Sequence, residues 1–477
     1  MKKILCLVLT LLFVAISLIG CGSGSGNNSG NANSGNTNSG NGGSTETTVN
    51  LHPDKDVKAT LRVAVTNYNA EKKIVSEIGQ LLTKQYPNVT IKLEEFSTKI
   101  SDQYASWYRN KNVPDILINN SFDMFTLSDK GILADLDPYL KAEAADPEST
   151  FDINDYYESY MEMGQENFDG RQLMIPRSSD RVVCHYNAAI FKAAGVDMSL
   201  VKNGWTWDDF MKVCATLRAY YDANNMKDYT LIDTYFTWEA VYNPIFESYG
   251  VQYFDEKGNV TLDSSNTENA LKFMRSIIDN RYASKPSVEQ AGMEGNKGCM
   301  LFHSQAASLM ATKLAAYYPD AEKVSDYYNV VTMPVIPGHE KIGCGAAGYS
   351  VYEGSENKDL AWQFLKILLS KEGQNIMADC GSNYVPVRKD MADYTNPENH
   401  WGKGYEDLNL SAYTYNCGAD EDPDWNCYTT FITQQKPKQA TNISNAITGL
   451  ISNYCNGEEY TKSITACTNA IKRYILM

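Results

Sequence analysis

Histidines, the side chains most often used for acid–base catalysis and zinc binding, are few and scattered in this chain. The sequence has five, and none stands in an H-E-x-x-H or similar zinc spacing: His52, His185, His303, His339 and His400. A G-x-S-x-G nucleophile elbow and a G-x-x-x-x-G-K-[ST] phosphate loop are also absent, and no carboxylate pair is singled out for glycoside hydrolysis. We therefore expect a protein that binds without catalysis, uses no cofactor and holds no metal ion.

Two further patterns imitate binding sites. Residues 343–348 (GCGAAG) match the dinucleotide pattern G-x-G-x-x-G, but that site needs a helix after the glycines. Tyr349-Ser350-Val351-Tyr352 instead predicts a strand, so a nicotinamide site is not expected. The acidic run Asp420, Glu421, Asp422 and Asp424 lacks the glycine and closing glutamate of an EF-hand loop, which favours a solvated turn over a calcium site.

The first elements of the body predict a parallel sheet. Leu61–Val65 alternates like a strand, an apolar stripe from Ile74 to Leu82 predicts a helix, and Val89–Leu93 predicts a second strand. A strand, a helix and a strand in this order form a βαβ unit. A third short strand, Val113–Ile118, ends in polar Asn119-Asn120-Ser121. Ligands of open parallel sheets gather at the carboxyl ends of strands, so this end is a candidate site.

The start of the chain predicts secretion and lipid attachment. Lys2 and Lys3 precede an apolar run, Ile4–Ile19, which is shorter than the roughly 20 residues that a membrane-spanning helix needs. The run ends in Leu18-Ile19-Gly20-Cys21, which resembles the lipobox of bacterial lipoproteins. That resemblance implies cleavage after residue 20 and a diacylglycerol on Cys21; the alternative is an ordinary signal peptide with a chance cysteine.

A flexible tether and an acidic body follow. Residues 22–44 are Gly, Ser or Asn with two exceptions, so we expect residues 21–57 to be a flexible tether and the body to begin near Lys58. The net charge of −16 disfavours nucleic acid as a partner. About 420 residues remain for the body, which is too many for one core and predicts at least two domains.

Nine cysteines remain after Cys6 in the signal and Cys21 are set aside. Their number is odd and no C-x-x-C pair occurs, which favours buried free thiols. Should disulfides form, the local candidates are Cys417–Cys427 and Cys455–Cys467.

Seven motifs occur in the order found in one family of binding proteins. They are KQYPNV (84–89), VPDI (113–116), KGILADL (130–136), FDGRQLMIP (168–176), HYNAAIFKAAG (185–195), WTWDDF (205–210) and LAWQFLK (360–366). Over residues 58 to about 390 the chain resembles the extracellular solute-binding family related to maltose-binding protein; the last 85 residues match less well.

This resemblance implies a two-lobe α/β fold of the type II periplasmic-binding-protein kind. Each lobe would be a mostly parallel sheet flanked by helices, with the ligand cleft between the lobes. The chain would cross between lobes near residues 170, 302 and 349, the last crossing being the glycine-rich passage. The expected first lobe is residues 58–170 plus 302–348, and the second is 171–301 plus 349–477.

The resemblance also implies a function. We expect a monomeric lipoprotein on the outer face of the cell membrane of a Gram-positive bacterium. It would capture a carbohydrate, an oligosaccharide rather than a monosaccharide, by hinge closure and deliver it to the permeases of an ABC importer. A receptor for another solute or for a sensor kinase stays open as an alternative, as does a secreted carbohydrate-active enzyme.

Positions at strand ends and crossings give the candidate ligand contacts. Aromatic rings would cover apolar sugar faces, and polar groups would bind hydroxyls. Trp238 and Tyr242 lie one helical turn apart and are expected to form a stacking platform. The full set of expected contacts is Tyr68, Asp115, Asn119, Arg177, Trp238, Tyr242, Ser304 and Tyr349.

Overall fold

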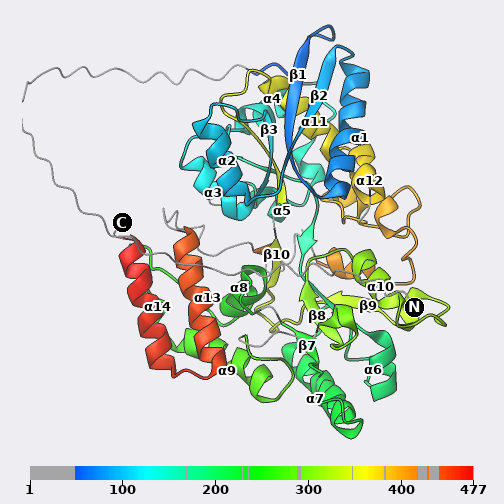
Figure 1. Cartoon of the computed structure of the whole chain (residues 1–477), viewed down its shortest axis with the longest axis vertical. Coiled ribbons are helices and arrows are strands. Elements are labelled where there is room, and N and C mark those ends of the chain that lie inside the picture. Colours follow the sequence, from blue (N-terminus) through cyan, green and yellow to red (C-terminus); the bar gives the residue numbers. More distant parts are fainter. Residues whose placement is uncertain are drawn as a thin grey trace, which may run out of the picture. The chain divides into compact units, whose positions relative to one another are not determined.

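The architecture is taken from a computed structural model of the chain (Figure 1). It describes residues 49–166, 170–227, 229–234, 236–286, 292–345, 347–380, 383–416, 427–428 and 440–475. The predicted lipid-attachment residue Cys21 and the acidic run 420–424 lie outside these residues. Among the helices that are described, none combines the length and the apolar character needed to span a membrane.

The first lobe is built on a five-stranded sheet. Its strand order is β2 (Val89–Phe96), β1 (Ala59–Thr66), β3 (Ile116–Asn120), β11 (Ala347–Val351) and β4 (Ile175–Pro176). The predicted βαβ unit is confirmed, because β1 pairs in parallel with β2 and with β3. Strand β11 runs antiparallel to β3 and β4. Helices pack around this sheet: α1 (Asn69–Gln85), α2 (Ile100–Arg109), α3 (Ser121–Ser128), α4 (Asp137–Ala145), α5 (Glu158–Glu162), α11 (Lys358–Leu369) and α12 (Lys371–Asp379), with the short helices η1 (Ile153–Asp155) and η4 (Lys389–Met391).

The second lobe is built on a four-stranded sheet of order β7 (Ile232–Asp233), β8 (Met300–His303), β6 (Val183–Tyr186) and β9 (Asn329–Thr332). Only β7 and β8 pair in parallel; β6 runs antiparallel to β8 and β9. The expectation of a mostly parallel sheet in each lobe is therefore wrong for this lobe, since its central strand β6 runs opposite to both neighbours.

Helices of the second lobe start and pack as their sequences predict. Asn187 caps α6 by accepting from the Ile190 N–H, and Thr206 forms a capping box with Asp209 at the start of α7. The helices of this lobe are α6 (Ala188–Ala194), α7 (Trp207–Ala223), α8 (Glu239–Ser248), α9 (Ser265–Asp279), α10 (Ala307–Ala315), α13 (Ala440–Asn456) and α14 (Tyr460–Ile475), with the short helices η2 (Met293–Gly295), η3 (Val324–Asp326), η5 (His400–Gly402) and η6 (Leu410–Tyr413). Helices α13 and α14 pack against each other beside α9 (Figure 1).

The chain passes between the lobes close to two of the three expected crossings, at β5 and β10, but not at residue 302. A small sheet, β12 (Cys427–Tyr428)–β10 (Ile342–Gly345)–β5 (Asp180–Arg181), lies on the passages: β5 leads from β4 to β6, and β10 leads from β9 to β11. No passage occurs at residue 302, because β8 is paired along its length with β6 inside the second sheet. Residues 300–332 thus belong to the second lobe and 347–380 to the first, which differs from the expected lobe boundaries.

The glycine-rich passage has a packing requirement at two of its glycines. A side-chain carbon added at Gly343 would lie 1.6 Å from the Ala240 carbonyl oxygen of α8, and one at Gly348 would lie 2.1 Å from the Ile175 oxygen of β4. The strand that follows, β11, agrees with the exclusion of a dinucleotide site. These glycines are needed where backbone meets backbone.

The paired-cysteine candidates do not form a disulfide where they are described. Cys455 and Cys467 are both buried free thiols in the second-lobe core, and Cys184, Cys214, Cys299 and Cys380 are buried free thiols as well. The other candidate, Cys417–Cys427, lies partly outside the described residues.

Residues 49–57, assigned by sequence to the tether, are a strap packed on the first lobe. Leu51 is 9% exposed in the first-lobe core, and its carbonyl oxygen accepts a buried hydrogen bond of 2.9 Å from Gln363 Nε2. The backbone N–H of Asn50 donates to Asp359 at 3.2 Å, and His52 Nε2 lies 2.8 Å from an Asp146 oxygen. The folded body therefore includes residues 49–57, ahead of its expected start near Lys58.

A chain that starts at Lys58 should be less stable than one that starts at Thr47. Removing the strap uncovers the apolar site of Leu51 and leaves the buried amide of Gln363 without its acceptor. Together these losses should lower the free energy of unfolding by on the order of 3 kcal/mol. Urea unfolding of both chains measures the difference. Equal midpoints would show that the strap adds nothing to the fold.

Candidate ligand-binding site

In each sheet, the edge formed by one set of strand ends borders the passages β5 and β10. In the first sheet, Pro176 and Asn120 at the carboxyl ends of β4 and β3 are in register with the start of β11. In the second sheet, His303 and Thr332 at the carboxyl ends of β8 and β9 pair with Val183, the first residue of β6. Because β5 runs into β6 and β10 runs into β11, these edges border the passages. We take them as the candidate site.

A buried ion pair occupies the first-lobe edge. Arg177, directly after β4, places its Nη1 3.4 Å from Glu71 Oε1, and its guanidinium lies 5.3 Å from the ring centre of Tyr384. The other Glu71 oxygen accepts from the Thr66 N–H at 3.0 Å and from the Thr66 hydroxyl. Arg177 Nε has no hydrogen-bond partner among the described residues. Tyr68, at the start of α1, is 48% exposed and therefore open to a ligand.

A second carboxyl group, Asp180, begins the passage strand β5. Burial raises the pKa of Asp180 to about 6, against the opposing effect of Arg177 and of a hydrogen bond from the Ala347 backbone. Glu71, Asp180 and Tyr384 were not predicted as site residues. No periodicity marks them, since each comes from a different element that the fold brings to Arg177.

An aromatic surface lies on the second-lobe edge. Trp238, just before α8, contacts the His303 ring with 5.3 Å between ring centres and 37° between planes. His303 Nδ1 accepts from the Gln305 N–H at 2.9 Å, and burial lowers the pKa of His303, so the neutral ring carries its proton on Nε2. Ser304 follows His303 directly in the sequence and is partly buried. An indole–imidazole surface with polar neighbours suits the face of a sugar ring.

Asp233 at the carboxyl end of β7 is a polar group that sequence reasoning missed. Its side chain is 4% exposed; Oδ2 accepts from the Met293 N–H at 2.9 Å, and Oδ1 has no partner among the described residues. Burial raises the pKa of Asp233 to about 6, against hydrogen bonds from the Met293 and Gly292 backbone, and nearby Glu294 adds to the rise. A buried oxygen without a partner is costly unless a ligand or water satisfies it. A polar residue after apolar Leu231-Ile232, the same signal that selected Asn119, would have found it.

Three predicted contacts are instead internal to the lobes. Tyr242 is fully buried in the second-lobe core, so the expected platform of Trp238 with Tyr242 does not form, and His303 is the ring beside Trp238. Tyr349 is fully buried in the first-lobe core. Asn119 is 1% exposed, and its Nδ2 donates to the Ser350 hydroxyl at 3.1 Å.

Asp115 lies at the opposite edge of the first sheet. It precedes β3 rather than following it, so it borders the amino ends of the strands. Its Oδ2 accepts from the Arg62 N–H at 2.8 Å, and its Oδ1 accepts from the Ser355 hydroxyl at 2.6 Å. It lines a cavity of about 740 Å³ that contains none of the other predicted contacts. The structure therefore does not bring Asp115 together with Asn119.

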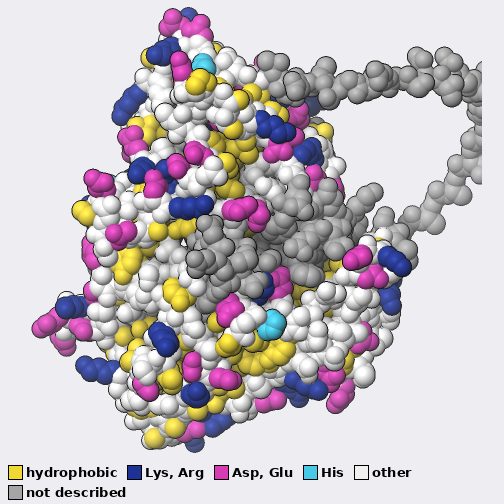
Figure 2. Space-filling model, turned by 180° about the vertical axis from the view of Figure 1, so that it is seen from behind, with side chains coloured by type: hydrophobic (Ala, Val, Ile, Leu, Met, Phe, Trp, Pro, Cys, Tyr) yellow, Lys and Arg dark blue, Asp and Glu magenta, His cyan; other side chains and the backbone are white. Residues whose placement is uncertain are grey.

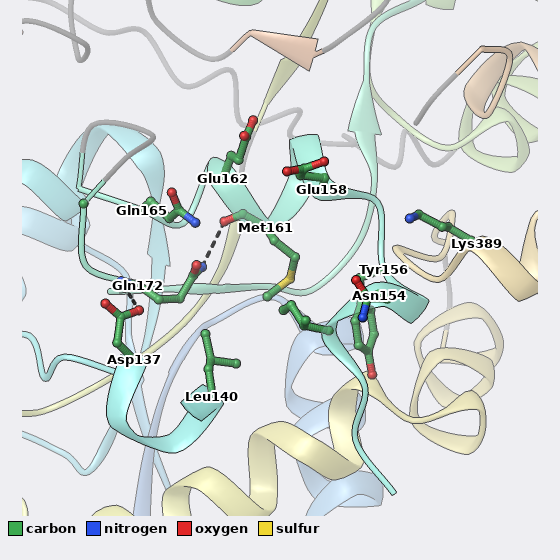
Figure 3. A pocket seen from close by; sticks show the side chains of 12 residues that line it. Asp137, Leu140, Asn154, Tyr156, Glu158, Met161, Glu162, Gln165, Gln172 and Lys389 are labelled. Carbon is green, nitrogen blue, oxygen red and sulfur yellow. Dashed lines mark hydrogen bonds between the residues drawn. The ribbon is translucent and has the colours of Figure 1, made fainter. Parts of the chain in front are cut away.

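A second cavity, of about 510 Å³, lies on the first lobe among α4, α5 and η1 (Figure 3). Asp137, Glu158 and Glu162 supply carboxylates to its rim, and Leu140 and Met161 supply apolar surface. Gln172 is held in place there, because its Nε2 donates to the Met161 carbonyl oxygen at 2.9 Å. None of the predicted ligand contacts lines this cavity.

Charge and metal-binding groups are dispersed over the molecule. Figure 2 shows basic and acidic side chains interspersed on the face that it presents. Among the residues with described positions, no group of three or more His, Cys, Asp or Glu side chains could hold a metal ion. The chemistry available at the facing edges is thus ring stacking, hydrogen bonding and one buried ion pair.

Comparison with known proteins agrees with this arrangement. A family model described as bacterial extracellular solute-binding protein matches residues 65–375. The arabinooligosaccharide-binding protein of Halalkalibacterium halodurans is 24% identical over 239 residues, which cover 47% of this chain and 49% of that protein.

Two solved structures share the fold. The cyclic alpha-maltosyl-1,6-maltose binding protein of Arthrobacter globiformis superposes with a TM-score of 0.67 at 17% identity, covering 88% of this chain and 99% of that one. UgpB of Mycobacterium tuberculosis, in complex with glycerophosphocholine, gives 0.64 at 18% identity, covering 87% and 98%. At these identities the likeness establishes the fold, and the predicted two-lobe α/β fold is confirmed.

Proposed function

We propose, from the premise that the chain belongs to the bacterial extracellular solute-binding protein family, that it captures an oligosaccharide between its lobes for an ABC importer. The lobes would close over the ligand by bending at the passage strands β5 and β10, and the closed, loaded form would dock on membrane permeases. Of the three similar proteins named above, two are named for a saccharide, an arabinooligosaccharide and cyclic alpha-maltosyl-1,6-maltose. The third was solved in complex with glycerophosphocholine, a phosphodiester.

The observation that carries the proposal is the second-lobe edge. The Trp238–His303 surface offers apolar contact to a sugar face, and the unsatisfied Asp233 Oδ1 offers an acceptor to a sugar hydroxyl. Exposed Tyr68 on the first lobe would cover the ligand from the other side, with Ser304 as a further hydroxyl contact. Arg177 is engaged by Glu71 and Tyr384, so we assign it to holding the passages rather than to the sugar.

Lipid attachment at Cys21 would keep the receptor at the outer face of the cell membrane. Residues 22–48 then separate the anchor from the strap that begins the folded body. A tether with the flexibility that this composition predicts would span about 30 Å on average over that length, which would let the body reach permeases nearby. Labelling with a radioactive fatty acid tests this step, because Cys21→Ser should abolish incorporation.

A thermal-shift panel on residues 47–477 tests the proposed ligand class. A saccharide at about 100 times its dissociation constant should stabilise the folded state by roughly 2.7 kcal/mol. The panel should pair arabino- and malto-oligosaccharides with glycerophosphodiesters, peptides and divalent metals. Stabilisation by a saccharide supports the proposal; stabilisation by another class alone, or release of reducing sugar from a substrate, would overturn it.

A further inference from the structure

Asp233 is a buried carboxyl group at the second-lobe edge of the candidate site. It pairs with Leu301 of β8, so its side chain lies on the same face of the sheet as His303, two residues further along that strand. The residue is 4% exposed; Oδ2 accepts from the Met293 N–H at 2.9 Å, and Oδ1 has no hydrogen-bond partner among the described residues. One carboxyl oxygen is thus dry and unsatisfied at the edge that carries the Trp238–His303 surface.

The charged side chains near Asp233 do not balance its charge. Glu294, which follows Met293 in η2, is a second carboxylate that acts on Asp233. Lys313 of α10 forms an ion pair with Glu294. His303 supplies no positive charge, because burial lowers the pKa of its ring. Within the described part of the chain, Asp233 therefore has backbone N–H partners but no cation.

A second carboxyl group beside the aromatic surface also lacks a cation. Glu239 directly follows Trp238 at the start of α8, and its Oε1 accepts from the Ser444 hydroxyl. Burial raises the pKa of Glu239, and no lysine or arginine with a described position pairs with it. The second-lobe edge thus combines exposed aromatic surface with an excess of carboxyl groups.

This excess of negative charge selects among ligands. A buried carboxylate is normally paired with a cation or a metal ion, and the described residues form no metal site. A neutral sugar hydroxyl would satisfy Asp233 Oδ1 but would leave its charge uncompensated. A protonated amine would satisfy both, and a positive charge also suits the faces of aromatic rings. A uronate or a phosphodiester would be repelled.

We propose that the captured oligosaccharide carries a protonated amino group, which binds Asp233 Oδ1 beside the Trp238–His303 surface. The inference rests on the proposed receptor function and names the chemical class of its ligand. Hydrogen bonds between charged partners are about twice as strong as those between neutral ones, so an amine in place of a hydroxyl should tighten binding by about tenfold.

Titration calorimetry of residues 22–477 with matched tetrasaccharides tests the inference. Three β-1,4-linked probes differ at C2 of each sugar: the glucosamine tetramer carries amines, the N-acetylglucosamine tetramer neutral amides and the glucose tetramer hydroxyls. The glucosamine tetramer should bind about tenfold more tightly than either neutral probe. A galacturonate tetramer, which is negatively charged, should bind more weakly than all three.

Asp233→Asn keeps the shape of the side chain and removes its charge. The preference for the glucosamine tetramer should disappear in this variant, while affinity for the neutral probes changes only a few-fold. The exposed control Asp208→Asn removes the same charge from α7 and should keep the preference. Should Asp233→Asn fail to fold, Lys313→Met replaces it: loss of the cation that neutralises Glu294 should increase the preference a few-fold.

The outcomes separate this inference from the receptor function on which it rests. Equal or tighter binding of the neutral probes, an undiminished preference in Asp233→Asn, or a reduced preference in Lys313→Met would overturn the inference. Binding confined to neutral saccharides, whether these probes or those of the thermal-shift panel, would also overturn it but would leave the receptor function standing. A chain that binds no saccharide, neutral or aminated, would overturn both.

Discussion

Replacing Trp238 with alanine should weaken saccharide binding by about 30-fold while leaving the protein folded. The indole is partly exposed and contacts the His303 ring at the edge of the second lobe. If a sugar covers about 80 Å² of it, the lost apolar contact is worth about 2 kcal/mol, which is about 30-fold in the dissociation constant. Titration calorimetry with the saccharide that gives the largest thermal shift measures the change.

Matched variants separate ring stacking from general damage. Trp238→Phe keeps a ring and should lose only a few-fold in affinity. Tyr108→Ala removes an exposed ring from α2 that lines the cavity of Asp115, at the other edge of the first sheet, and should leave affinity unchanged. Unaltered affinity in Trp238→Ala, or an equal loss in Tyr108→Ala, would place the ligand elsewhere.

Local sequence patterns predicted the elements of the fold well. The alternation of Leu61–Val65 and the stripe after it gave β1 and α1, because burial on one face repeats with the period of the element. The apolar stripe of Leu360–Leu369 likewise became the buried face of α11. Such patterns report which side of an element is buried but not which lobe it is buried in. That is why β8 was placed at a passage and β11 in the wrong lobe.

The predicted site residues divide by whether their neighbours are local in sequence. Trp238, Tyr68 and Ser304 lie at element ends, and the structure leaves them partly or well exposed at the facing edges. Tyr242 is one helical turn from Trp238, yet Trp238 precedes α8 and Tyr242 lies inside it on the core side. The Tyr242 N–H donates to the Trp238 carbonyl oxygen, but the backbone of Trp238 is extended, so the two rings do not share one helical face. The missing partner, His303, lies 65 residues away on β8.

Buried polar groups were the hardest to predict. Glu71, Asp180 and Tyr384 come from α1, β5 and the segment after α12. Glu71 and Tyr384 contact Arg177, and Arg177 lowers the pKa of Asp180, so none of the three could be recognised from its own stretch of sequence. Arg177 itself was singled out as a ligand contact, from its position directly after Ile175-Pro176. Its role as a ligand contact remains a prediction of the sequence, and its contacts with Glu71 and Tyr384 beside the passages favour a structural role.

Replacing Gly343 with valine should cost at least about 3 kcal/mol of folding free energy, the largest stability effect we expect from one substitution. Any side-chain carbon there would lie 1.6 Å from the Ala240 carbonyl oxygen and 2.5 Å from its carbonyl carbon. Both are backbone atoms of α8, so neither can rotate away as a side chain could. Strand β10 would have to leave α8, which also moves the passage between the lobes.

Gly449→Ala is the matched control, because Gly449 lies inside α13 and an added carbon meets nothing within 4 Å. In a helix interior that change should stabilise the protein by about 0.5–1 kcal/mol. In urea unfolding, the midpoint should therefore fall for Gly343→Ala, fall further for Gly343→Val and rise for Gly449→Ala. A Gly343→Val protein as stable as the unmodified chain would mean that β10 does not pack on α8 in solution. It would also contradict the conclusion that close backbone contacts hold the passages.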